Sequence, residues 1–123
     1  MIKSHVFGKK AELAVANLLQ ADHFTILEQN YTKFFGEVDI IAQKDDVVIF
    51  VEVKARNNSQ ISMFDLVTPS KQQKVIKAAR AYIAYNKLKN MTYRFDVALV
   101  QGNKNDETEI TYIPNAFYQR GGL

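Results

Sequence analysis

Two Val- and Ile-rich segments, separated by only four polar residues, constrain the fold of this chain more than any other feature. The segments run from Glu37 to Ala42 and from Val47 to Ala55, and Gln43-Lys44-Asp45-Asp46 joins them. Apolar, β-branched runs on either side of a short polar connection predict a β-hairpin. Any fold of this sequence therefore has to accommodate an apolar hairpin whose two strands also carry three acids, Glu37, Asp39 and Glu52.

The flanking segments predict two helices and further strands. Apolar residues at helical spacing indicate a first helix over Ser4–Ala21. Thr68 and Pro69 supply an N-cap and a first-turn proline for a second helix that runs to about Asn90. A short strand is expected at Phe24–Leu27, ending near Asn30-Tyr31, and another at Arg94–Val100. A weaker strand is expected at Glu109–Ile113, after a turn over Gly102–Asp106. The order α-β-β-β-α-β predicts an α/β fold in which helices flank a mixed sheet.

The size and composition of the chain indicate one globular domain. The sequence has 123 residues, of which 47% are hydrophobic and 24% are charged. We expect residues 1–118 to form a single domain and residues 119–123 to be a flexible tail. The absence of cysteine excludes a disulfide scaffold, a thiolate zinc site and a cysteine nucleophile. Without a secretory signal or an apolar stretch of about 20 residues, a cytoplasmic protein that does not enter the membrane is expected.

Positive charge is concentrated in the second half of the chain. Residues 1–60 hold seven Lys or Arg and eight Asp or Glu, whereas residues 61–123 hold nine and five. No acid lies between Leu66 and Phe95, a stretch with seven bases: Lys71, Lys74, Lys77, Arg80, Lys87, Lys89 and Arg94. Such a field suits a polyanion such as nucleic acid, and the alternative is an ordinary solvated helix face. Tyr82 and Tyr85 on the same helix are candidates for stacking on bases, with core packing as the alternative for Tyr82.

The acids of the hairpin are predicted to share one face with a lysine. Side chains alternate along a strand, so Glu37 lies on the side of Asp39, and Glu52 on the side of Lys54. A turn centred on Lys44-Asp45 would place Glu37 directly opposite Glu52 and Asp39 diagonal to Glu52. Diagonal neighbours are about 7–8 Å apart, a span that one metal ion can bridge.

Carboxylates in so apolar a frame need a positive partner. Carboxylate oxygens are the ligands that Mg²⁺ prefers, and Lys54 would place a charge beside the ion. The alternative is an ion-pair cluster in which Lys54 neutralises Glu52. Glu12, at the border of the first helix's apolar stripe between Gly8 and Ala16, has small neighbours that leave room for it to point at the hairpin.

Three stretches of the chain resemble known proteins. They are Gly36-Glu37-Val38-Asp39-Ile40-Ile41-Ala42, Phe50-Val51-Glu52-Val53-Lys54-Ala55-Arg56 and Arg94-Phe95-Asp96-Val97. Together they resemble the YraN-like family of uncharacterised bacterial proteins, and the first two are also similar to archaeal Holliday-junction resolvases. Both groups belong to the restriction-endonuclease-like PD-(D/E)xK nuclease superfamily, and the likeness extends from Glu12 to about Val100.

The resemblance implies a role for each matching residue. Asp39 and Glu52 would be ligands of Mg²⁺ or Mn²⁺, Lys54 the catalytic lysine, and Glu12 a further ligand or an outer acid. The chain departs from the superfamily pattern in having Val38 where proline is often found. Gln72 and Gln73 are not followed four residues later by tyrosine, which argues against a RecB-like exonuclease.

The leading hypothesis is therefore a magnesium-dependent endonuclease that hydrolyses phosphodiester bonds in DNA, with junction or branched DNA as the substrate. Arg56, Lys71 and Lys74 are the candidate phosphate contacts. One alternative is a non-catalytic nucleic-acid-binding protein of the same fold, and another is a protein-interaction scaffold. Resolvases pair to cut two strands, so the resemblance raises the question of a homodimer, which the sequence itself leaves open.

Overall fold

The computed structural model describes residues 4–56, 67–102 and 107–123, with side chains of the first helix from Gly8 onward. Seven elements follow one another in the order that the sequence predicts, with the weak fifth strand present. They are α1 (Ser4–Ala21), β1 (Thr25–Lys33), β2 (Gly36–Lys44), β3 (Val47–Arg56), α3 (Pro69–Tyr85), β4 (Thr92–Gly102) and β5 (Thr108–Phe117).

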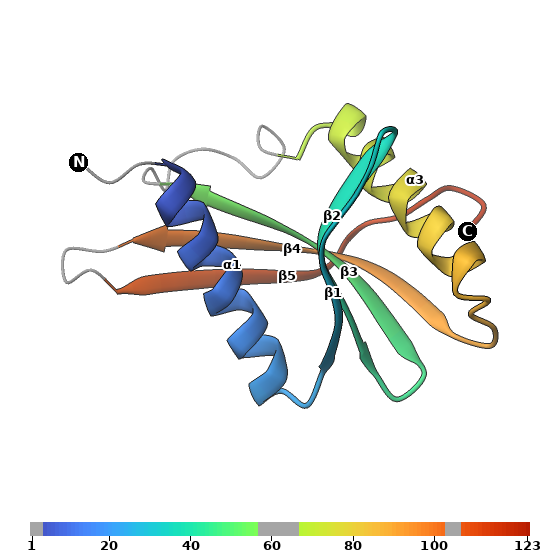
Figure 1. Cartoon of the computed structure of the whole chain (residues 1–123), viewed down its shortest axis with the longest axis horizontal. Helices are drawn as coiled ribbons and strands as arrows, with labels where there is room; N and C mark the ends of the chain where they lie inside the picture. The colour runs from blue at the N-terminus through green and yellow to red at the C-terminus, as the bar shows by residue number, and fades with distance from the viewer. Residues whose placement is uncertain (1–3, 57–66, 103–106) are drawn as a thin grey trace.

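The five strands form one mixed sheet in sequence order, from β1 at one edge to β5 at the other. Neighbouring strands are antiparallel except β3 and β4, which are parallel. A parallel pair needs a crossover connection, and α3 lies within it. The expected α/β class with a mixed sheet flanked by helices is confirmed (Figure 1).

Two apolar clusters, one on each face of the sheet, hold the helices. Along β3 the buried side chains alternate, so Val48 and Phe50 pack with α3 whereas Ile49 and Val51 pack with α1. Tyr82 of α3 is buried, with its ring centroid 5.3 Å from that of Tyr31. Tyr82 is thus a core residue.

Several element boundaries differ from the sequence prediction. β1 extends to Lys33, beyond the expected end near Asn30-Tyr31, because it pairs along most of β2. α3 stops at Tyr85 and not near Asn90, since Asn86 caps it by donating its Nδ2 to the carbonyl of Tyr82 at 2.9 Å. The predicted turn over Gly102–Asp106 falls mostly on residues 103–106, outside the described residues.

The hairpin of β2 and β3 has a different register from the predicted one. Ala42 pairs with Ile49, not with Val47, because the two-residue turn consists of Asp45 and Asp46. Asp45 adopts φ 54°, the left-handed conformation that tight hairpin turns require. The predicted opposition of Glu37 and Glu52 is therefore wrong by two residues. A shift of two preserves alternation, so Asp39 and Glu52 remain on one face.

No helix in the described ranges is long and apolar enough to cross a bilayer.

Asp96, on β4, is a fully buried carboxylate whose oxygens are saturated by β4 and β5. Arg94 donates to it through Nε and Nη2, both at 2.9 Å. The Tyr112 hydroxyl donates at 2.5 Å and the Asn115 backbone N–H at 2.8 Å. The β4–β5 register shifts between Phe95 and Val97, so Asp96 ties the two strands together where their pairing is irregular.

We expect Asp96→Ala to lower the free energy of unfolding by about 3 kcal/mol, because it leaves the partly buried Arg94 guanidinium, the Tyr112 hydroxyl and the Asn115 N–H without their acceptor. Tyr112→Phe, which removes one donor only, should cost about 1 kcal/mol. Urea denaturation of the two variants measures the difference. Equal losses in both would show that the carboxylate does not organise this strand pair.

Candidate active site

The strands β2 and β3 separate at Asp39. Their ladder ends at the pair Ile40 and Val51. Beyond it, the Oδ2 atom of Asp39 accepts a hydrogen bond of 2.7 Å from the backbone N–H of Val53, so a side chain takes the place of a strand carbonyl. Figure 1 shows the start of β2 leading toward α3 while the end of β3 leads away from it. The candidate site lies in this fork.

The apolar clusters change face at the same residue. Val38 packs in the cluster of α3, whereas Ile40, two residues on, packs in the cluster of α1. Residues two apart on a regular strand share a face, so the strand bends or twists at Asp39. Neither the fork nor this bend has a signal in the local sequence.

Glu52 is a buried acid beside Asp39. Its residue is only 6% exposed, and the Nζ atom of Lys54 lies 3.8 Å from its Oε2 atom. Burial, a hydrogen bond with the Asp39 side chain and the negative charge of Asp39 raise the pKa of Glu52 to about 9, and Lys54 opposes the shift. Without a metal ion, this raised pKa favours the protonated form of the Glu52 carboxyl at neutral pH.

Lys71 reaches this cluster from the first turn of α3. The helix begins at Thr68, whose side-chain oxygen accepts from the Lys71 backbone N–H at 3.3 Å. A hydrogen bond with the Lys54 side chain, partial burial and the charge of Lys54 lower the pKa of Lys71, while Glu52 and Asp39 act in the opposite direction. The site thus brings together two acids from neighbouring strands and two lysines, one from β3 and one from α3.

Glu12 approaches the acids from α1. It is half-buried, and burial together with the negative charge of Asp39 raises its pKa, against a hydrogen bond with Asn30. A Cβ atom added at Gly8 would meet nothing within 4 Å, so the expected room beside Glu12 exists on that side. Asn30, which has φ 53°, is a neighbour of Glu12 that no motif in the sequence marks.

The other two candidate residues border the cluster. Lys74 is exposed on α3, and its carbonyl oxygen lies against Gly36 at the start of β2. Arg56 is half-buried at the end of β3, two residues beyond Lys54. The structure therefore gathers Asp39, Glu52, Lys54 and Lys71 closely, with the remaining candidates at the margin, and their roles stay predictions.

The donor set fits a hard divalent cation at the acid pair. The Asp39 and Glu52 carboxyl groups lie close together, and burial and the charge of Asp39 raise the pKa of Glu52. The pair therefore offers oxygen ligands at a place where a positive charge would be stabilising. Within the part of the chain that the structure describes, no group of three or more His, Cys, Asp or Glu is close enough to hold a metal ion. Glu12 is thus a neighbour of the pair, and its role as a ligand stays a prediction.

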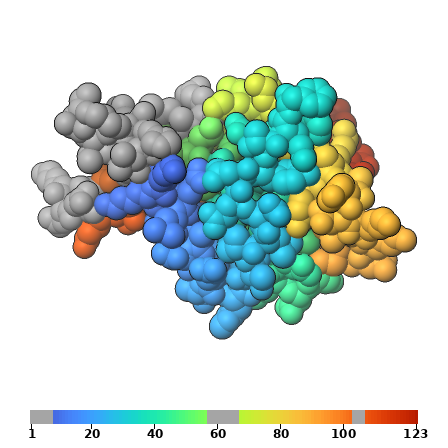
Figure 2. All heavy atoms as spheres, viewed as in Figure 1, coloured from blue at the N-terminus to red at the C-terminus, as the bar shows by residue number. Residues whose placement is uncertain are grey.

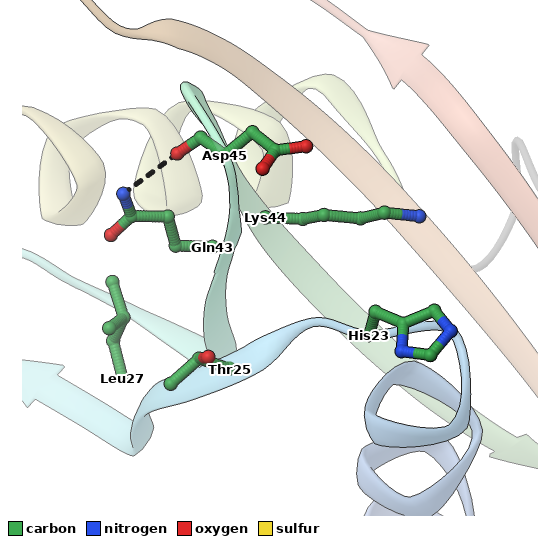
Figure 3. Close-up of a pocket in the computed structure, with 6 residues that line it drawn as sticks. All are labelled: His23, Thr25, Leu27, Gln43, Lys44 and Asp45. Atoms are coloured by element: carbon green, nitrogen blue, oxygen red, sulfur yellow. Dashed lines mark hydrogen bonds between the residues drawn. The ribbon is translucent and has the colours of Figure 1, made fainter.

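A hollow of about 600 Å³ lies elsewhere on the described surface, near the Asp45 turn. Figure 3 shows the residues that line it. Its lining consists of His23, Thr25, Leu27, Gln43, Lys44 and Asp45. Lys44 is five residues from Asp39, or about 17 Å along a strand, so the hollow is separate from the acid pair.

Fold and site together define a small α/β protein in which a buried acid and a half-buried acid lie side by side where two strands separate. The chain belongs to the uncharacterised protein family UPF0102, whose family model matches residues 11–100 and thus spans every candidate residue. The predicted relationship to the YraN-like family is confirmed.

Relatives in several bacteria match nearly the whole chain. A UPF0102 protein of Nitrosomonas europaea is 40% identical over 111 residues, which cover 89% of this chain and 92% of its own length. A UPF0102 protein of Hahella chejuensis is 37% identical over 118 residues, which cover 95% of this chain and 94% of its own length. A UPF0102 protein of Clostridium botulinum is 39% identical over 112 residues, which cover 89% of this chain and 92% of its own length.

The raised pKa of Glu52 predicts a pH-dependent stability. Because the folded-state pKa of about 9 exceeds the unfolded value of 4.5, the contribution of protonated Glu52 is fully present below about pH 4.5 and is lost as the pH rises through about 9. Glu52→Gln keeps the hydrogen bonding and cannot ionise. In chelator, its unfolding free energy should exceed that of the wild type by a margin that grows from about pH 5 to about pH 9.

The matched control is Glu109→Gln, which alters an exposed acid of β5 that is not among the groups acting on Glu52. The margin for Glu52→Gln should grow far more over this range than the difference that the control shows. A constant margin for Glu52→Gln would mean that Glu52 is ionised in the folded protein at neutral pH.

Proposed function

We propose that this protein is a divalent-metal-dependent nuclease of the restriction-endonuclease-like PD-(D/E)xK superfamily that hydrolyses phosphodiester bonds in DNA. The observation that carries the proposal is the buried Glu52 carboxyl, hydrogen-bonded to Asp39 at a strand fork with Lys54 beside it. Burying an acid against another acid costs stability, and a divalent cation would remove that cost. The resemblance to resolvases favours branched or junction DNA as the substrate.

The residues of the fork divide the chemistry among them. Asp39 and Glu52 would hold Mg²⁺ or Mn²⁺, with Glu12 as a further ligand or outer acid. Such an ion, when bound, activates a water and neutralises charge on the scissile phosphate. The Val53 N–H keeps Asp39 oriented, and the Lys54 ammonium stabilises the negative charge that develops on the phosphate.

The basic residues at the margin suit the path of the DNA backbone. Lys71 contacts Lys54, so it belongs to both the acid cluster and the surface of α3. Lys74 and Arg56 lie on the two elements that border the fork. Contacts of this kind position nucleic acid without reading its sequence.

A non-catalytic nucleic-acid-binding protein of the same fold is the second candidate. One observation favours it: the described residues supply no third acid or histidine close enough to complete a metal site with the acid pair. Salt-dependent DNA binding that survives Glu52→Ala, without cleavage by the wild type in Mg²⁺ or Mn²⁺, would select this candidate.

Metal binding should stabilise the wild-type protein and release a proton. At a hundredfold excess of Mn²⁺ over its Kd, we expect the unfolding free energy to rise by about 2.7 kcal/mol. Because the ion displaces the proton of Glu52, its affinity should increase with pH up to about 9. Calorimetry in buffers of different ionisation enthalpy measures the release. Equal stabilisation of Asp39→Asn would place the ion elsewhere.

Cleavage and binding should depend on different lysines. A screen of linear, flapped and four-way DNA in Mg²⁺ or Mn²⁺ identifies the substrate that the wild type cleaves. Lys54→Ala should abolish this cleavage and keep most of the DNA affinity, because one ammonium among many bases contributes little to binding. Lys71→Ala combined with Lys74→Ala should weaken binding and lower the slope of log K against log salt by about two.

The matched control removes the same charge from the segment after α3. Lys87→Ala combined with Lys89→Ala changes two exposed bases beyond Tyr85, the last residue of that helix. Its binding and salt slope should stay close to those of the wild type. Equal effects of the two double variants would show that the basic residues attract DNA only through their total charge, and that Lys71 and Lys74 do not form a specific binding surface.

A further inference from the structure

The tip of the β1–β2 hairpin carries an aromatic ring that the described part of the chain leaves uncovered. Lys33 pairs with Gly36, so Phe34 and Phe35 form a two-residue turn. Phe34 is fully exposed, at 101% of its reference area, whereas Phe35 is half-buried. The two rings meet edge to face with centroids 5.0 Å apart, which supports Phe34 at the surface. A single exposed apolar residue is ordinary, so its surroundings decide its meaning.

The tip is fixed against the start of α3. A Cβ atom added at Gly36 would overlap the carbonyl oxygen of Lys74, so only glycine permits this approach of strand to helix. Figure 1 shows the tip beside the beginning of α3, and Figure 2 shows both segments at the same margin of the surface. The aromatic tip is therefore held next to the helical turns that carry Lys71 and Lys74.

The surroundings of the tip are mostly basic. Lys33 precedes Phe34, with its Nζ atom 5.0 Å from the ring centroid of Tyr31, and the exposed Lys71 and Lys74 lie on α3. Glu37, one residue after Gly36, is the acid nearest in the chain. An exposed aromatic ring surrounded by lysine side chains is a combination that binds single-stranded nucleic acid. Nucleobases stack on the ring, and the lysine ammonium groups contact the phosphates.

The tip is also close to the acid pair. Five residues separate Phe34 from Asp39, which span at most about 17 Å along an extended strand. At about 3.4 Å of rise per nucleotide in one strand of a duplex, this span covers no more than about five nucleotides. One nucleic acid can therefore contact Phe34 and the fork at the same time.

We propose that Phe34 stacks on an unpaired base, so that the protein selects nucleic acid with unpaired bases within a few nucleotides of the phosphate at the fork. The faces of bases inside a continuous duplex are covered by their neighbours, and a protein ring reaches only bases that are unpaired or extruded. The inference rests on the proposed function in one respect, that the ligand is nucleic acid.

The chain contains no tryptophan, so Phe34→Trp provides a single fluorescent reporter at the tip. In chelator, which prevents cleavage, single-stranded DNA and a flapped duplex should quench its emission. A relaxed closed-circular duplex, which has neither ends nor unpaired bases, should quench it far less. Tyr85→Trp is the matched control, because Tyr85 is 84% exposed but lies about 21 Å along the helix axis from Lys71. Its emission should change little with either DNA.

Affinity measurements give the second readout. Phe34→Ala should weaken binding of single-stranded and flapped DNA about tenfold, the loss typical of one stacked base, and leave affinity for the closed duplex unchanged. Phe34→Tyr keeps the ring and should retain the wild-type preference. Tyr85→Ala should change neither affinity.

Three outcomes would overturn the inference: an equal loss for both DNAs in Phe34→Ala, no loss for either, or no DNA binding by the wild type at low salt. The first two leave the proposed nuclease intact if Lys54-dependent cleavage is observed. Conversely, selective loss in Phe34→Ala without any cleavage by the wild type would support the stacking role and refute the catalytic one.

Discussion

The hydrogen bond that Asp39 accepts from the N–H of Val53 fixes the point where β2 and β3 part, and the candidate site depends on that separation. A continuous ladder would keep the two strands in contact and cover the acids on them. The Asp39 carboxylate instead satisfies the first N–H that the departing strand leaves without a partner, so the fork opens without an unpaired donor there. Glu52 can then be buried on the sheet and still lie near Lys71 of α3, while Asp39 lies near Glu12 of α1.

Each charged group at the fork, considered alone, is unfavourable for the stability of the folded protein. Glu52 is buried beside another acid, and Lys71 places a positive charge in the first turn of α3, where the helix dipole disfavours it, next to a second lysine. Acids and lysines from three elements offset each other only as a group. Such local conflicts are typical of sites kept for function, and a divalent cation with a phosphate would supply the charges that balance them.

The contact between Gly36 and Lys74 links the site to the surface around it. It holds the beginning of β2 against the first two turns of α3, so the aromatic tip, the basic helix face and the acid pair keep fixed relative positions. Asp96 has a different part in the fold, because the hydrogen bonds that it accepts from the described residues come from β4 and β5 and not from the acid cluster. The two carboxylate clusters of the sheet thus divide between strand pairing and the candidate chemistry.

The sequence by itself determined the order of the elements, the cap of α3 at Thr68 and the common face of Asp39, Glu52 and Lys54. These features follow from local periodicity and capping, which act over a few residues and survive a register error of two. Only the tertiary structure decided the true register, the length of β1, the fork at Asp39 and the contact of Lys71 with Lys54. Each of these depends on a backbone turn conformation or on packing between segments distant in the sequence. The energy of such contacts depends on residues far apart in the chain, so the local sequence does not determine it.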